Sequence, residues 1–175
     1  MRWIAVLALT ICPAFAECPP APDIAEAEGL LLEAARAAPS EEAARGISSK
    51  LWALWAAAPD AKAQALLDRG MAARRKWDFV TSLAAFDALV AYCPHYAEGY
   101  NQRAFVYFLS AEYERALADL DLAIARSPRH VAAISGKALT LMGLERMDEA
   151  QEVLRHALSL NPWIPERAYL RGEAL

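Results

Sequence analysis

The stretch AEGYNQRAFVYFLSAEYERALADLDLAIARSP spans residues 97–128, and its pattern recurs on both sides of it. Residues 97–130 align with residues 131–164 without a gap, and the aligned pairs include Ala104 with Ala138, Ala116 with Ala150, Leu120 with Leu154, Ala123 with Ala157, and Pro128 with Pro162. A further shift by the same length brings residues 63–96 into this register, with Gly70 and Ser82 at the two small positions. The chain therefore contains three consecutive units of equal length.

A period of about 34 residues, with small residues at two fixed places and a proline near the end of each unit, resembles the tetratricopeptide repeat family. The resemblance covers residues 63–164 and implies that each unit folds as two antiparallel helices. The small residue of the first helix would face the small residue of the second, so that the two backbones can approach closely. The proline cannot continue the second helix, and it would instead begin the helix that follows.

The composition also favours helices, because much of the 57% hydrophobic content is alanine and only 7 glycines are present. We expect an all-α fold, a right-handed α-solenoid of three helix hairpins. Two segments flank the repeats. Residues 24–60 are expected to form an N-terminal helical pair, either a degenerate repeat or a cap, and residues 165–175 a C-terminal capping helix.

The N-terminal segment, residues 1–16, differs in character from the rest of the chain. Arg2 precedes an apolar run over residues 3–11, and Ala14-Phe15-Ala16 has the small-x-small pattern of a cleavage site. The apolar run is shorter than the ~20 residues that a membrane span needs. Residues 1–16 are therefore predicted to be a signal peptide that is cleaved after Ala16. The alternative is a retained N-terminal anchor.

Cleavage would make the protein periplasmic or secreted, with no stable membrane anchor. The mature chain would begin with a proline-rich leader, residues 17–23. It would keep two cysteines, Cys18 and Cys93, which could form a disulfide in an oxidising compartment. Alternatively, Cys93 is a small buried residue and Cys18 stays unpaired in the leader.

Several function classes receive no support from the sequence. With 18 Lys and Arg residues against 22 Asp and Glu, the chain has a net charge of −4 and lacks the basic patch expected of a nucleic-acid-binding protein. The histidines at 95, 130 and 156 are scattered, so we expect no metal site and no cofactor. No serine lies in a glycine-framed turn of the kind that presents a nucleophile, and we expect no catalytic residues.

In tetratricopeptide arrays the first helix of each pair lines a concave groove, so the resemblance implies which residues face a partner. The predicted groove residues are Met71, Arg74, Arg75, Asn101, Phe105, Phe108, Leu139 and Met142. The lysine-and-asparagine clamp that holds a C-terminal carboxylate in some members is absent, because its lysine positions hold Leu67 and Gln64. Alternatively, the protein's own N-terminal helices fill the groove, with Trp52 and Trp55 packed on Phe105.

An apolar groove that contains methionines and aromatics suits an apolar helix or an extended peptide. We therefore expect a protein- or peptide-binding adaptor or scaffold, and not an enzyme. The alternative function is that of a structural or assembly subunit of a cell-envelope complex, held by its flanks and edges rather than by its groove. The sequence does not identify the partner.

Overall fold

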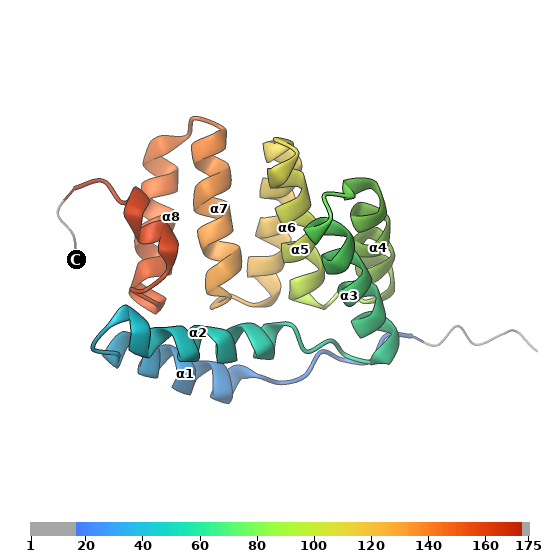
Figure 1. Cartoon of the computed structure of the whole chain (residues 1–175), viewed down its shortest axis with the longest axis horizontal. Coiled ribbons are helices and arrows are strands. Elements are labelled where there is room, and N and C mark those ends of the chain that lie inside the picture. Colours follow the sequence, from blue (N-terminus) through green and yellow to red (C-terminus); the bar gives the residue numbers. More distant parts are fainter. Residues whose placement is uncertain (1–16, 173–175) are drawn as a thin grey trace, which may run out of the picture.

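The computed structural model describes residues 17–172, and this part of the chain is entirely helical apart from its connections (Figure 1). The predicted signal peptide, residues 1–16, lies outside the described residues. The elements are α1 Ala25–Ala37, α2 Glu41–Trp55, α3 Ala61–Arg75, α4 Phe79–Tyr92, α5 Ala97–Leu109, α6 Tyr113–Arg126, α7 Val131–Gly143, α8 Met147–Leu160, and the short 3-10 helix η1 Pro165–Tyr169. The all-α solenoid predicted from the sequence is confirmed.

Polar side chains cap the starts of four helices, α2, α3, α4 and α7. Ser40, Asp60 and Asp78 each accept a hydrogen bond from the backbone N–H three positions later, at 3.3, 2.8 and 3.0 Å. Such caps satisfy one of the backbone donors that the first turn of a helix leaves without a partner. They fix the starts of α2, α3 and α4.

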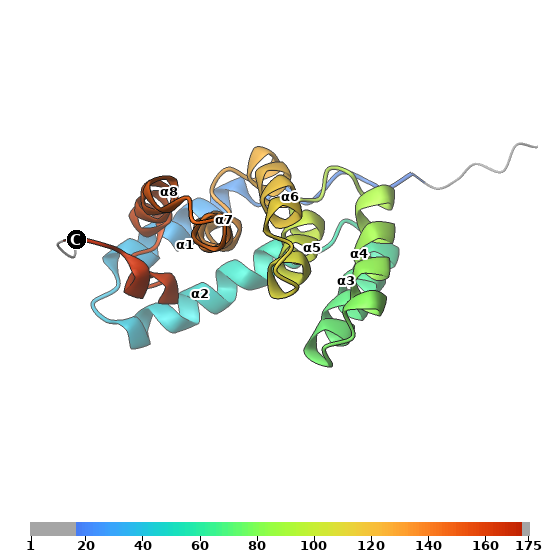
Figure 2. The same cartoon turned by 90° about the horizontal axis from the view of Figure 1, so that it is seen from above.

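Helices α3 to α8 form three hairpins that stand side by side, one for each repeat unit (Figures 1 and 2). The small residues lie at the close contact within each hairpin. In the first hairpin Ser82 Oγ donates a hydrogen bond to the Gly70 carbonyl oxygen at 2.8 Å, and a Cβ on Gly70 would overlap the ring of Phe86. In the other two hairpins Ala104, Ala116, Ala138 and Ala150 are completely buried.

The turn inside each hairpin contains one residue in the left-handed region. Trp77, Ala111 and Glu145 have φ angles of 61°, 57° and 61°. The three residues occupy the same position in successive repeats. The turns therefore share one backbone conformation as well as one sequence pattern. None of the three is glycine, although glycine adopts this conformation at the lowest cost.

The N-terminal hairpin α1–α2 does not stack in front of α3 as a further repeat would. It runs across the ends of the repeat helices, roughly perpendicular to them, and α1 contacts α8 (Figure 1). Its last residue, Trp55, lies between Tyr96 and His130, which occupy the same position in successive units. The Tyr96 hydroxyl donates to the Trp55 carbonyl oxygen at 2.8 Å, and the indole of Trp55 stacks on the His130 ring.

The C-terminal segment covers the last repeat with a single 3-10 turn, which is shorter than the capping helix expected over residues 165–175. Ile164, just before this turn, is buried in the same apolar cluster as Leu51 and Trp55. Gln151 on α8 fixes the turn, because its amide nitrogen donates to the Tyr169 carbonyl oxygen at 3.0 Å. Both α1 of the N-terminal hairpin and η1 therefore contact α8 of the last repeat.

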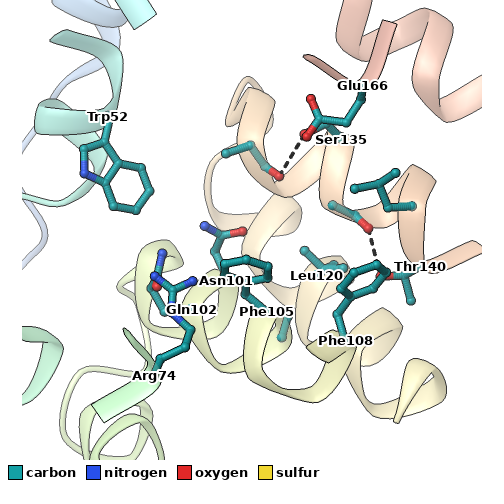
Figure 3. A pocket seen from close by; sticks show the side chains of 14 residues that line it. Trp52, Arg74, Asn101, Gln102, Phe105, Phe108, Leu120, Ser135, Thr140 and Glu166 are labelled. Carbon is teal, nitrogen blue, oxygen red and sulfur yellow. Dashed lines mark hydrogen bonds between the residues drawn. The ribbon is translucent and has the colours of Figure 1, made fainter. Parts of the chain in front are cut away.

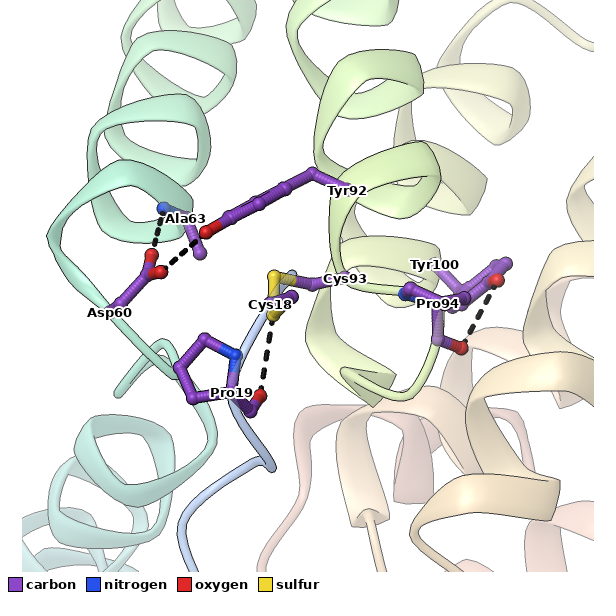
Figure 4. Close-up of a disulfide and its surroundings, with 8 residues drawn as sticks. All are labelled: Cys18, Pro19, Asp60, Ala63, Tyr92, Cys93, Pro94 and Tyr100. Atoms are coloured by element: carbon purple, nitrogen blue, oxygen red, sulfur yellow. Dashed lines mark hydrogen bonds between the residues drawn. A yellow bond between two sulfur atoms is a disulfide. The ribbon is translucent and has the colours of Figure 1, made fainter. Parts of the chain in front are cut away.

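A disulfide joins Cys18 of the leader to Cys93 at the end of α4 (Figure 4). The two cysteines are 75 residues apart in sequence, and their Cα atoms are 5.2 Å apart. The bond ties the leader to the junction between the first two repeats. No helix among residues 17–172 is both long enough and apolar enough to cross a membrane.

Candidate functional site: a cavity on the concave face

The first helices of the second and third repeats, α5 and α7, line a cavity of about 260 Å³ (Figure 3). Trp52 of α2, Arg74 of α3, Leu120 of α6 and Glu166 of η1 complete its wall. Its floor is largely apolar, and the lining residues include Ala104, Phe105, Phe108, Leu120, Ala132, Gly136 and Leu139. The cavity is therefore built where two repeats meet, and the N-terminal hairpin adds one side.

Most of the predicted groove residues come together around this cavity. Its lining contains Arg74, Asn101, Phe105, Phe108 and Leu139. The other three predicted residues lie elsewhere: Met71 packs against the apolar cluster of the first repeat, Arg75 is exposed, and Met142 packs against the cluster between α7, α8 and the N-terminal hairpin.

Phe105 is the most accessible aromatic residue of the cavity, with 44% of its surface exposed. The guanidinium carbon of Arg74 lies 4.3 Å from the centre of its ring, so that a cation covers one face of the aromatic. Burial lowers the pKa of Arg74, while the charge of Glu98 raises it and that of Arg75 lowers it further. Phe108 is half-buried and packs at an angle against Tyr113, with ring centroids 5.6 Å apart.

A buried carboxylate, Glu98, organises the polar wall of the cavity. Its Oε1 accepts a hydrogen bond from the Gln102 amide nitrogen at 2.6 Å, and its Oε2 accepts one from the Asn101 amide nitrogen at 2.9 Å. Oε2 also lies 2.8 Å from His130 Nε2. The Ala133 backbone N–H donates to His130 Nδ1, so we place the imidazole proton on Nε2, facing Glu98. Asn101 is therefore held by its neighbours and does not project freely into the groove.

Glu98 and His130, both 1% exposed, are not among the site residues predicted from the sequence. A histidine beside a proline at a repeat boundary suggests only a polar turn residue. The signal that identifies His130 is the repeat register: Tyr96 and His130 stand at equivalent places, and both are rings that contact Trp55. Charged and polar groups are rarely buried without hydrogen bonds, and both Glu98 and His130 have them.

The N-terminal hairpin occupies the groove only in part. Trp52 forms one wall of the cavity, but Trp55 is packed against His130 instead of Phe105. Phe105 and Phe108 remain accessible beside Trp52. The alternative in which Trp52 and Trp55 both pack on Phe105 therefore differs from the structure, because the indole of Trp55 stacks on His130, at the end of the repeats.

The lining of the cavity carries few ionisable groups. Its ionisable lining residues are Arg74 and Glu166, one at each side. Among residues 17–172, no group of three or more His, Cys, Asp or Glu side chains is arranged to hold a metal ion. The Gln102 Oε1 atom is buried without a hydrogen-bond donor from the described residues.

Comparisons with known proteins agree with the repeat structure. The family model of the tetratricopeptide repeat matches residues 133–162. A TPR repeat-containing protein of Rhizobium etli is 35% identical over 60 residues, which is 34% of this chain and 29% of that protein. The chain thus matches less than a third of the length of this curated relative.

Solved structures show the same fold. The first TPR domain of Spaghetti (RPAP3), bound to an HSP90 peptide, superposes with a TM-score of 0.61 at 22% identity, over 63% of this chain and 90% of that one. A TPR2B domain of yeast Sti1 in complex with an Hsp70 peptide gives 0.55 at 26% identity, over 56% and 78%. A double mutant of MamA gives 0.58 at 21% identity, over 86% and 83%.

Proposed function

Because the chain is a tetratricopeptide-repeat protein, we propose that it is an adaptor that holds a segment of a partner protein or peptide in its concave cavity. The observation that carries this proposal is the pair of accessible phenylalanines, Phe105 and Phe108, in a hollow that two repeats and Trp52 enclose. A largely apolar hollow with a few polar groups at its edge is a usual form of binding site. The similar domains of RPAP3 and yeast Sti1 hold peptides, which supports the proposal.

We also propose that the protein works in the periplasm or outside the cell. Two features support this: the signal-like pattern of residues 1–16 and the disulfide between Cys18 and Cys93. Disulfides persist in oxidising compartments and are rare in the cytosol. Intact mass of the chain recovered from the periplasm tests the proposal, and a membrane-bound chain that still carries residues 1–16 contradicts it.

The groove proposal is tested with Phe105→Ala and Phe108→Ala. If a partner docks on these rings, each change should weaken its binding by about 2 kcal/mol or more, as the loss of an aromatic anchor does. Partners are first captured by cross-linking in intact cells, and affinities are then measured with the purified partner. Leu122→Ala is the matched control, because Leu122 is exposed to a similar degree, 40%, and is not among the residues that line the cavity.

Melting temperatures of the same variants separate binding from folding. Phe105 is half exposed, so its truncation should destabilise the protein by much less than the roughly 3–5 kcal/mol typical of a core aromatic. A large loss of stability with unchanged affinity for the partner would end the groove proposal.

A second candidate, a structural subunit of an envelope complex held by its edges, is favoured by one observation. Trp77 and Val80, at the turn and start of α4 in the first repeat, are 72% and 82% exposed. They lie outside the cavity and form an apolar edge. If this edge carries the interaction, Trp77→Ser and Val80→Ser should release the cross-linked partner while Phe105→Ala should not.

A further inference from the structure

The guanidinium group of Arg74 is a cation without a carboxylate partner at the side of the cavity. It is half-buried and stacked on Phe105, and among the described residues none of the ion pairs includes it. Stacking uses the face of the guanidinium and leaves the N–H groups at its edge available. Those N–H groups form the planar fork that matches a carboxylate.

The charge of Glu98 acts on Arg74, but Glu98 does not form an ion pair with it. It raises the pKa of Arg74 through its charge, but burial outweighs that effect and the pKa of Arg74 stays below its usual value. The oxygens of Glu98 are already engaged with Asn101, Gln102 and His130. Arg74 is therefore a cation whose burial is only partly offset within the protein.

The two sides of the cavity carry opposite charges. Arg74 stands at the first-repeat side, and Glu166 stands at the side of η1, with Phe105, Phe108 and Leu139 between them. A segment that fills the cavity therefore meets a positive group, then an apolar floor, then a negative group. An acidic side chain is favoured beside Arg74 and is disfavoured beside Glu166.

We propose that Arg74 binds an Asp or Glu side chain of the partner segment, and that the next apolar side chain of this segment lies on Phe105 and Phe108. This inference rests on the proposed groove function. It assigns the partner a chemistry, an acidic residue followed by an apolar one, that the groove function alone does not specify.

The segment is an internal part of a chain and not a C-terminal end. The cavity adjoins a second hollow of about 210 Å³ that shares Trp52, Ser135 and Glu166 with it and extends to Trp163, which gives a longer segment room beyond the cavity. The lysine positions of the clamp for a terminal carboxylate hold Leu67 and Gln64. Arg74 stands outside that clamp.

The test is selection from a library of random peptides that are displayed without a free C-terminus, on the full disulfide-bonded chain. The wild-type protein should enrich peptides with Asp or Glu at a fixed spacing from an apolar residue. The Arg74→Gln variant should enrich the same apolar residue without the acid. Arg75→Gln removes the same charge one position away, outside the cavity lining, and should select like the wild type.

The selected peptide is then synthesised with its acidic residue and with the matching amide. The amide should bind the wild type and Arg75→Gln about tenfold more weakly, the usual effect of losing one charged hydrogen bond. On Arg74→Gln the two peptides should bind equally. Melting temperatures show whether each variant is folded.

The other outcomes contradict the role of Arg74 in different ways. Apolar peptides without an acid preference overturn that role and leave the groove function standing. An acid preference that persists in Arg74→Gln also overturns it. If only a second library with free C-termini yields binders, the ligand is a terminal carboxylate and the side-chain assignment is wrong. If neither library yields binders, the groove function fails as well.

Discussion

The indole of Trp55 lies on the imidazole of His130, with ring centroids 4.1 Å apart and an angle of 17° between the planes. Its Nε1–H donates to Glu28 Oε1 at 2.9 Å, so the same side chain joins α1, α2 and the start of α7. Trp55 is 6% exposed. This contact fixes the N-terminal hairpin on the repeats.

Trp55→Ala should lower the free energy of unfolding by about 3–5 kcal/mol, because a large buried ring is removed and the Glu28 carboxylate loses a donor. Trp52→Ala, on the same helix, is the matched control. Trp52 is only half-buried in the cavity wall, so its loss should be much smaller. Chemical denaturation measures both, and equal losses would contradict the assigned role of Trp55.

Ala116→Leu and Ala150→Leu should each destabilise the protein by about 1–3 kcal/mol or more, because these completely buried residues lie at the close contact within a hairpin and cannot take extra volume. Glu114→Leu adds a leucine to the exposed side of α6 and should be nearly neutral. Melting temperatures provide the comparison. Similar values for the three variants would show that the repeat register is wrong.

Ala111→Gly should raise the free energy of unfolding by about 0.5–1 kcal/mol, because Ala111 has a φ of 57° and glycine adopts this conformation without the Cβ clash. Ala118→Gly, on the exposed side of α6, makes the same chemical change in a helix and should instead cost about 1 kcal/mol. Urea denaturation of the two variants should therefore give shifts of opposite sign. A loss at both positions would argue against strain in the turn.

Reduction of the disulfide should lower the free energy of unfolding by about 4 kcal/mol in the chain-entropy model, because the closed loop is long. Cys18→Ser should have the same effect and should no longer respond to reductant. Thiol titration of the denatured, non-reduced protein gives the direct check. Two titratable thiols in the chain recovered from the periplasm would mean that the bond is not formed there.

The repeat array could be predicted from sequence because its contacts are local. The small residues of a hairpin, such as Gly70 and Ser82, lie 12 positions apart, and the same spacing recurs in each unit. The course of the N-terminal hairpin could not be predicted in this way. It depends on contacts such as that of Trp55 with Tyr96, 41 positions away, which no periodic pattern encodes.

The sequence likewise predicts one part of the candidate site and not the other. The helical register predicts that Phe105 and Phe108 share a face, and the structure places both at the cavity. The engagement of Asn101 by Glu98 and the burial of His130 depend on how two repeats and the hairpin meet. Met71 and Met142 pack against neighbouring apolar clusters instead of lining the cavity. An α-helix has 3.6 residues per turn, so residues three or four positions apart face slightly different directions.

The contact between the N-terminal hairpin and the last repeat changes how the molecule should unfold. In an open array each repeat touches only its neighbours, so that an end can fray while the middle stays folded. Here Arg167 pairs with Glu41, 126 positions away, and the Asn161 amide nitrogen at the end of α8 donates to Ser48 Oγ across 113 positions. These contacts hold the last repeat to the N-terminal hairpin as well as to its neighbouring repeat, so that it should not fray without releasing the hairpin. Loss of order should consequently spread through the whole array in one cooperative transition, and folding should be slower than in an open array of equal length, because these distant contacts must form.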